Sequence, residues 1–111
     1  MRKPKFEMLT GNDGSTYFQL KTATGTVVLT SRGFLKKVDA IQGIVSVMRF
    51  GVFESRYVRK ETGTGKYFFQ LLSPSGRVLG WSETYYSKQC RDNGIVAVRR
   101  AVQFGKVLDL N

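Results

Sequence analysis

The residue types that perform most enzyme chemistry are thinly represented in this chain of 111 residues. Histidine, which most often serves as a general base, is absent, so the common schemes for hydrolysis and acyl transfer lack their proton acceptor. The single cysteine, Cys90, falls in the expected first turn of a helix, where the dipole favours a thiolate, but no histidine can activate it. A packing or incidental role for Cys90 is favoured, and we expect no enzymatic activity and no catalytic residue.

The acidic residues and the glycine-rich turns do not form a recognisable ligand site either. The eight carboxylates are scattered along the chain, and no cluster of cysteine and histidine has the spacing of zinc ligands. The run Gly63-Thr64-Gly65-Lys66 resembles part of a phosphate-binding loop, but Tyr67 follows where that loop needs Ser or Thr. Because a strand rather than a helix should come next, we interpret the run as a hairpin turn and expect no metal and no cofactor.

The charge balance is the clearest functional signal in the composition. Eighteen Lys and Arg against eight Asp and Glu give a formal net charge of +10, which suits a polyanionic partner such as DNA or RNA. The alternative is that the charge serves solubility alone. A lone cysteine excludes an internal disulfide, no charged and then apolar leader opens the chain, and no apolar run reaches the ~18 residues that cross a bilayer. We expect a cytoplasmic protein with no membrane partner.

Sliding the sequence along itself by 51 positions reveals a tandem repeat. Phe18-Gln19-Leu20 aligns with Phe69-Gln70-Leu71, and Gly43-Ile44-Val45 aligns with Gly94-Ile95-Val96, without a gap. A unit of about 50 residues buries too little surface to be stable alone, so the two copies should share one core about a pseudo-two-fold axis. We expect one domain over 1–111, with repeats at about 5–55 and 56–111. The protein should be a monomer in which the two repeats form an internal pseudo-dimer.

Hydrophobic periodicity predicts the same elements in both copies. The first copy indicates strands at about 5–9, 16–21 and 26–30 and a helix at about 36–49. The second copy indicates strands at 66–72 and 77–82, a helix capped by Ser87 that ends near 101 or 102, and a final strand at 106–110. The run 52–61 has strand character, so we expect it to close the first repeat and open the second.

The first helix should lie on the sheet through residues spaced three and four apart, which are Ile41, Ile44, Val45 and Met48. Gly43 lies inside this helix and recurs as Gly94 in the second, although glycine costs ~1 kcal/mol against alanine there. Its recurrence indicates that each helix approaches a neighbour closely at this position.

The chain resembles the YegP-like family of small bacterial proteins over nearly its whole length. The resemblance is carried by residues 65–71 (GKYFFQL), 76–79 (GRVL), 82–88 (SETYYSK) and 93–98 (NGIVAV). It implies an α+β fold of two tandem β-β-β-α-β repeats, in a single antiparallel sheet with two helices on one face and exchange of the last strands between repeats. The first copy departs from the family pattern at 32–37 (RGFLKK), where it lacks the serine that caps the helix. The family brings no activity with it.

The sheet face opposite the helices is expected to be open, and we place a candidate nucleic-acid site there. The alternation of the strands puts two aromatic rings on it among amide and cationic side chains. Further cations follow in the run 52–61, which should cross from the first repeat to the second, and at the end of the second helix. The candidate residues are Tyr17, Gln19, Lys21, Arg56, Arg59, Lys60, Phe68, Gln70, Arg77, Arg99 and Arg100.

Two interpretations of these residues remain open. In the first, DNA or RNA stacks its bases on the rings for ~1–3 kcal/mol each while the cations meet phosphate. In the second, the rings are ordinary cross-strand pairs, and Arg99 and Arg100 merely stabilise a helix terminus. The function that we favour is a non-enzymatic module that binds nucleic acid. The alternative is a protein-protein interaction or stress-associated module that uses a sheet edge or an apolar patch.

Overall fold

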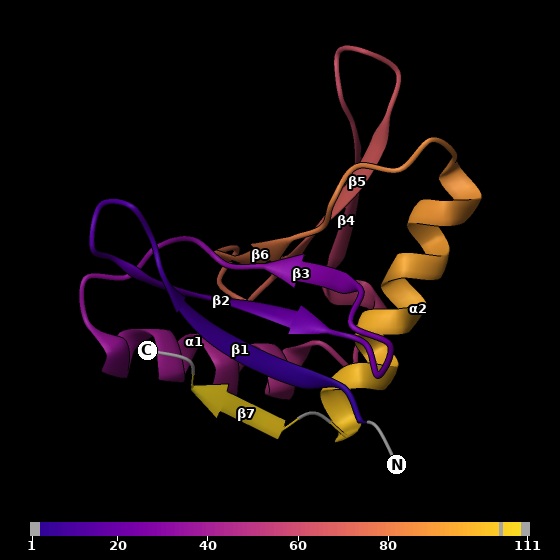
Figure 1. Ribbon diagram of the computed structural model, residues 1–111. Coiled ribbons are helices and arrows are strands. Elements are labelled where there is room, and N and C mark those ends of the chain that lie inside the picture. The colour runs from indigo at the N-terminus through magenta and orange to yellow at the C-terminus, as the bar shows by residue number, and fades with distance from the viewer. Residues whose placement is uncertain (1–2, 105, 110–111) are drawn as a thin grey trace.

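The computed structural model describes residues 3–104 and 106–109 of the chain (Figure 1). The elements follow the predicted order with boundaries shifted by a few residues. They are β1 (Lys5–Thr10), β2 (Thr16–Lys21), β3 (Val27–Thr30), α1 (Lys37–Phe50), a 3-10 turn η1 (Glu54–Arg56), β4 (Tyr57–Glu61), β5 (Tyr67–Leu72), β6 (Val78–Trp81), α2 (Lys88–Phe104) and β7 (Lys106–Asp109).

The strands form one sheet in the order β4-β5-β6-β3-β2-β1-β7. The two repeats meet at its centre, where Thr30 of β3 lies opposite Trp81 of β6. Each last strand pairs in the other half of the sheet, β4 with β5 and β7 with β1, which is the exchange that the family resemblance implies. The α+β architecture built from two repeats is therefore confirmed.

The sheet is antiparallel from β4 to β1, and β7 adds one parallel pairing that the sequence did not predict. The register explains it. Tyr57 lies opposite Leu71 as Phe6 lies opposite Leu20, so β4 occupies beside β5 the place that β1 already fills beside β2. Strand β7 must then attach on the outer side of β1. The repeat gives β7 the same direction relative to β2 that β4 has relative to β5, which is antiparallel. Because β1 is also antiparallel to β2, strands β7 and β1 are parallel to each other.

The run 52–61 is not the continuous strand that its composition indicated. The 3-10 turn η1 interrupts its first half, and the N–H of Arg56 donates to the carbonyl oxygen of Phe53 at 3.1 Å. Strand β4 begins only at Tyr57, whose buried hydroxyl donates to the carbonyl oxygen of Gly51 at 2.6 Å. The chain leaving α1 is turned by these two bonds before it can join the sheet.

The turn at Gly63-Thr64-Gly65 is a hairpin turn, as interpreted from the sequence. The N–H of Thr62 donates to the carbonyl oxygen of Lys66 at 2.8 Å, and Gly65 has a φ of +81°, which glycine adopts without steric cost. Strand β5 begins directly afterwards at Tyr67, so no helix N-terminus is present there to meet a phosphate.

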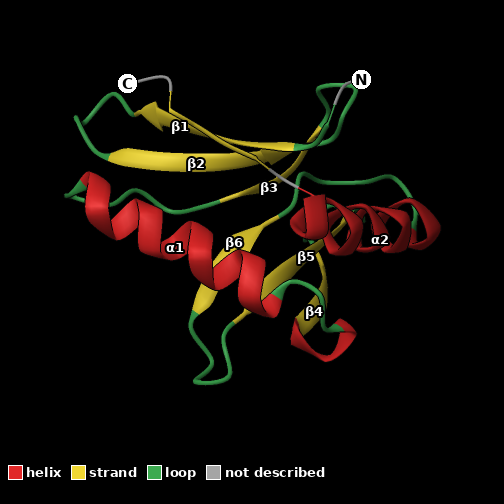
Figure 2. Cartoon of the chain, turned by 90° about the horizontal axis from the view of Figure 1, so that it is seen from below, coloured by secondary structure: helices red, strands yellow, loops and turns green. Residues whose placement is uncertain are grey.

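Both helices cover the same face of the sheet (Figure 2) and bury a shared core beneath them. From the sheet, the core takes Phe18 and Leu20 of the first repeat and their counterparts Phe69 and Leu71 of the second, all four fully buried. From the helices it takes Ala40, Ile44, Val47, Ile95, Val98 and Ala101. At about 25 cal/mol per Å² of apolar surface, this burial is the main source of stability.

The face that α1 buries differs in part from the prediction. Ile44 is buried, but Ile41, Val45 and Met48 are exposed, so the expected contact face is wrong for those three. The reason lies at Gly43, where an added Cβ would stand only 3.0 Å from a ring carbon of Phe18. With Gly43 against this ring, the helix buries Ala40, Ile44 and Val47 and leaves the other three aliphatic residues outside.

The glycines inside the helices mark the close approach that their recurrence indicated. A Cβ at Gly94 would stand 2.6 Å from the hydroxyl oxygen of Tyr85, and one at Gly43 would stand 3.1 Å from a ring carbon of Phe34. Ser87 caps α2 as predicted, because its hydroxyl accepts the N–H of Cys90 at 3.0 Å. Helix α1 begins after Lys36 without any side-chain cap. No helix in the described part of the chain is long and apolar enough to cross a membrane.

Candidate nucleic-acid interface

The open face of the sheet carries one continuous row of side chains that crosses both repeats. The row follows from the strand register, in which each residue lies opposite the next. Its members are Glu7, Gln19, Thr30, Trp81, Gln70 and Val58. The single tryptophan therefore lies near the centre of the face, and we call this set the open-face row.

Two further aromatic rings flank the open-face row. Tyr17 precedes Gln19 by two positions on β2, and Phe68 precedes Gln70 by two positions on β5, so both point to the same face as the row. The buried positions alternate with them on both strands, which agrees with the predicted choice of face. Both rings are half-buried by their neighbours and present part of their surface to solvent.

Trp81 is the residue of this face that the sequence did not single out as a candidate. The first repeat has Thr30 at the equivalent position, so the repeat gave no support for it. Its side chain is 40% exposed. The structure places it opposite Gln70 of β5, and that pairing puts it on the same face as the predicted site.

The charges on the first-repeat side of the face are largely compensated. Glu7 is buried among them, and the ammonium groups of Lys21 and Lys5 lie 2.7 and 3.5 Å from its carboxylate oxygens. The hydrogen bond from Lys21 holds the pKa of Glu7 below its usual value. Lys21 therefore lies on the predicted face, but its charge is already balanced by a neighbour.

The three candidate cations in the run 52–61 lie in different surroundings. Lys60 lies opposite Phe68 and points to the open face, whereas Arg59 lies opposite the buried Phe69 and points to the helix side. Arg56 ends the 3-10 turn next to β4.

Arg59 is held by two carboxylates on the helix side. Its Nη2 lies 2.7 Å from Oε1 of Glu54 and its Nε 3.0 Å from Oδ1 of Asp92, and this pairing lowers the pKa of Asp92. Arg59 thus fastens β4 to α2 and does not join the open-face row.

The remaining three candidate arginines also lie outside the open face. Arg77 extends from the β5–β6 turn into a cavity beside α1. Arg99 donates from Nε to the carbonyl oxygen of Val52 at 3.1 Å, which ties α2 to the segment after α1. Arg100 is exposed on α2. The structure therefore brings together the aromatic and amide candidates with Lys21 and Lys60, and it distributes the arginines elsewhere.

Side chains that could ligate a metal do not gather around these residues. Within residues 3–104 and 106–109, no three carboxylate or cysteine side chains lie close enough together to hold a metal ion. Cys90 is exposed on the first turn of α2. The open face carries aromatic rings, the amides of Gln19 and Gln70 and the ammonium group of Lys60.

Comparison with known proteins agrees with the repeat and with the fold. Residues 12–52 and 64–109 match the family described as a domain of unknown function, DUF1508. The chain belongs to this family. The two matched segments coincide with the two repeats, so the chain is a tandem DUF1508 protein.

Relatives of this DUF1508 chain span almost its full length. It is 34% identical to the UPF0339 protein YegP of Escherichia coli, over 85% of this chain and 86% of that protein. It is 32% identical to a UPF0339 protein encoded in the 5′ region of the ptx operon of Stutzerimonas stutzeri, over 95% of each chain.

Two solved structures are similar to the tandem DUF1508 fold described above. The solution NMR structure of YegP from E. coli, described as a protein of unknown function, has a TM-score of 0.92 at 31% identity and covers 99% of this chain and 95% of its own. A UPF0339 protein from Shewanella oneidensis has a TM-score of 0.90 at 30% identity and covers 97% and 92%. The YegP-like resemblance inferred from the sequence is thereby confirmed.

Proposed function

We propose that this DUF1508 protein binds single-stranded nucleic acid on the open face of its sheet. The observation that carries the proposal is the position of Trp81, 40% exposed near the centre of the open-face row. Tyr17 and Phe68 lie on either side of it, so three rings are available to stack on unpaired bases. Gln19 and Gln70 supply donors and acceptors for the edges of those bases.

The electrostatics of the chain support a polyanionic ligand. Lys60 points to the open face beside Phe68, and the excess of Lys and Arg over acidic residues leaves a net charge of +10. Attraction of this kind acts over about 10 Å at moderate salt, so cations beside the face also contribute to the encounter. Phosphate contacts supply affinity without sequence preference, and stacking on the rings selects single strands over a duplex.

Replacing Trp81 with threonine, the residue of the first repeat, is expected to weaken binding of a labelled single strand about tenfold or more. Phe68→Ala should add a further loss. Fluorescence anisotropy with single- and double-stranded DNA and RNA at ~50 and ~200 mM salt measures both. Quenching of the only tryptophan reports stacking directly. The matched control is Tyr86→Ala, which removes an exposed ring that follows β6 and lies off the sheet.

Two results contradict this proposal. Absence of binding at low salt, in spite of the net charge of +10, removes nucleic acid as the ligand. The other result is binding that weakens with salt and is reduced equally by Tyr86→Ala and Trp81→Thr. That result would mean that charge attraction alone holds the nucleic acid and that bases do not stack on the open face.

A protein-interaction function is the second candidate, and one specific observation favours it. Helix α1 and the segment before it expose an aliphatic stripe that consists of Leu35, Val38, Ile41, Val45 and Met48. The second repeat has Gln89, Asp92 and Arg99 in place of Val38, Ile41 and Met48. The fold therefore does not require apolar residues at these positions. An exposed apolar stripe of this kind is typical of an interaction surface.

The spacing within the stripe favours a second copy of this chain as the partner. Val38, Ile41, Val45 and Met48 follow the alternating three- and four-residue steps of a helix-pairing seam. In an antiparallel pair of α1 helices, Val38 lies opposite Met48 of the other copy and Ile41 opposite Val45, so the stripe is complementary to itself.

Sedimentation velocity over a hundredfold concentration range, at a salt concentration that screens the positive charge, tests this interaction against the predicted monomer. We expect concentration-dependent dimers of the natural chain and only monomers of the triple variant Val38→Gln, Ile41→Asp, Met48→Arg, which copies the residues of α2. A natural chain that is monomeric throughout contradicts self-association and agrees with the monomer predicted from the sequence.

A further inference from the structure

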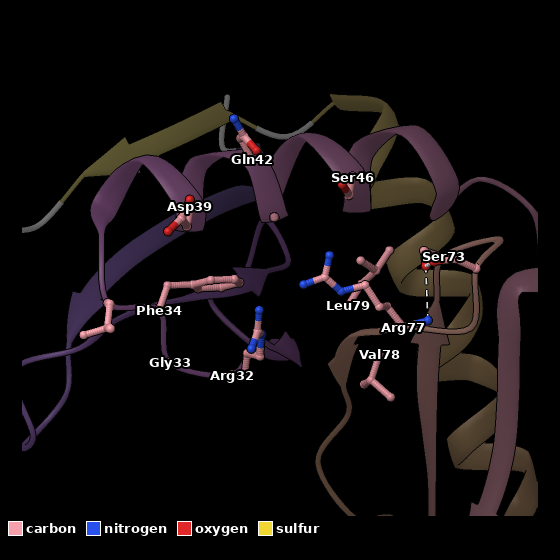
Figure 3. A pocket seen from close by; sticks show the side chains of 13 residues that line it. Arg32, Gly33, Phe34, Asp39, Gln42, Ser46, Ser73, Arg77, Val78 and Leu79 are labelled. Atoms are coloured by element: carbon pink, nitrogen blue, oxygen red, sulfur yellow. Dashed lines mark hydrogen bonds between the residues drawn. The ribbon is translucent and has the colours of Figure 1, made fainter.

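A cavity of about 620 Å³ lies on the helix side of the sheet, away from the open-face row (Figure 3). One wall is helix α1, with Gln42 and Ser46. The segment before α1 and the β5–β6 turn form the other walls, and they contribute Arg32 and Arg77. Figure 3 shows both guanidinium groups reaching into the space between Phe34 and Leu79. We call this the arginine cavity.

The two arginines have no carboxylate partner among the described residues. Arg32 rests with its guanidinium carbon 4.8 Å from the ring centroid of Phe34, and Arg77 is exposed. Asp39 is the single acidic residue among those that line the cavity, and no ion pair joins it to either arginine. Two positive charges in one cavity repel each other, which is unfavourable. An anion bound between them would attract both and offset this repulsion.

The positions related to these arginines by the repeat show that the fold does not require this arrangement. The positions equivalent to Arg32 and Arg77 are occupied by Glu83 and Thr26. The equivalent groove beside α2 therefore carries one acid and no arginine at these positions, although the helix and strands around it are the same. Packing alone does not account for the two arginines, one from each repeat, which meet beside α1 and have no counterparts beside α2.

We propose that the arginine cavity binds a small phosphate monoester. Two guanidinium groups present planar pairs of donors that match phosphate oxygens, and the hydroxyl of Ser46 and the amide of Gln42 add hydrogen bonds. Phe34 and Leu79 form apolar walls for the organic part of the ligand. The volume lies within the range of sites for small molecules, which is roughly 300–1,000 Å³.

The test is an NMR titration of the ¹⁵N-labelled chain with phenyl phosphate, inorganic phosphate and phenol. Phenyl phosphate should shift the amide signals of residues 32–46 and 73–79, inorganic phosphate should shift them more weakly, and phenol should not shift them. Arg32→Gln and Arg77→Thr should each weaken phenyl phosphate binding about tenfold or more, because each removes a charge-assisted contact. The control Arg100→Gln removes an exposed arginine of α2 and should leave the affinity unchanged.

Several outcomes would overturn the proposal. Shifts of equal size around Glu83 and Thr26 would mean diffuse attraction to a positive protein, and so would equal losses in Arg32→Gln and Arg100→Gln. Binding of phenol as strong as that of phenyl phosphate would mean that the phosphate group does not contribute to binding. Amide spectra of the free variants establish that each remains folded.

This inference is independent of nucleic-acid binding. Trp81→Thr should leave the phenyl phosphate titration unchanged. A single-stranded oligonucleotide should shift signals of the open-face row, whereas shifts confined to the arginine cavity would mean that the cavity recognises nucleic-acid phosphate and not a small ester.

Discussion

Replacing Ser82 with alanine is expected to lower the free energy of unfolding by about 2–3 kcal/mol, although only one oxygen atom is lost. The side chain is buried after the end of β6. Its hydroxyl accepts the N–H of Phe69 at 3.0 Å and donates to the carbonyl oxygen of Glu83 at 2.7 Å. Alanine would leave both backbone groups without these partners in a place that water does not reach easily.

The same bonds occur in the first repeat, which makes the prediction testable twice. The hydroxyl of Ser31 accepts the N–H of Phe18 at 2.9 Å and donates to the carbonyl oxygen of Arg32 at 2.8 Å. Urea unfolding of Ser31→Ala and Ser82→Ala should therefore give similar losses. Ser75→Ala, in an exposed turn, is the control and should stay within about 0.5 kcal/mol of the natural chain. A loss of unfolding free energy below about 0.5 kcal/mol in both Ser31→Ala and Ser82→Ala would contradict this prediction.

The second large effect is expected at the junction of the two repeats, where Gly80→Ala should cost about 1–3 kcal/mol of stability. An added Cβ would stand 2.9 Å from Cγ of Leu29 and 3.0 Å from the carbonyl oxygen of Thr30. The carbonyl belongs to the backbone and cannot move away freely. Because Thr30 and Trp81 form the one registered pair between β3 and β6, displacement here pushes the halves of the sheet apart.

A double-mutant cycle with Leu29→Ala separates this clash from other causes. Leu29→Ala alone removes buried aliphatic atoms at a cost of about 2–5 kcal/mol, but it also vacates the space that the methyl group introduced by Gly80→Ala needs. The two losses should therefore sum to more than the loss in the double variant. Gly63→Ala is the control, because a Cβ there meets no atom within 4 Å. Strict additivity in the cycle would mean that the Cβ clash is not the cause.

The sequence alone was sufficient to predict two similar repeats that share one sheet, although not the parallel pairing of β7. The repeat at 51 positions ties each element of one half to its counterpart in the other, so weak local patterns support each other across the chain. Alternation along 16–21 predicted which side of β2 faces the core, because successive side chains of a strand point to opposite faces. The recurrence of Gly43 as Gly94 predicted close packing of both helices, since glycine inside a helix otherwise carries a cost.

The tertiary structure alone decided how these elements meet. Helical spacing tells which residues share a side of α1, but the aromatic rings under Gly43 decide which side is buried, and so leave Val38 and Val45 exposed. Trp81 became central to the open face only when β6 paired with β3 of the other repeat. Arg32 and Arg77 are far apart in the chain and share a cavity because β6 packs against α1. Contacts between distant segments depend on the packing of the whole molecule, which local periodicity does not encode.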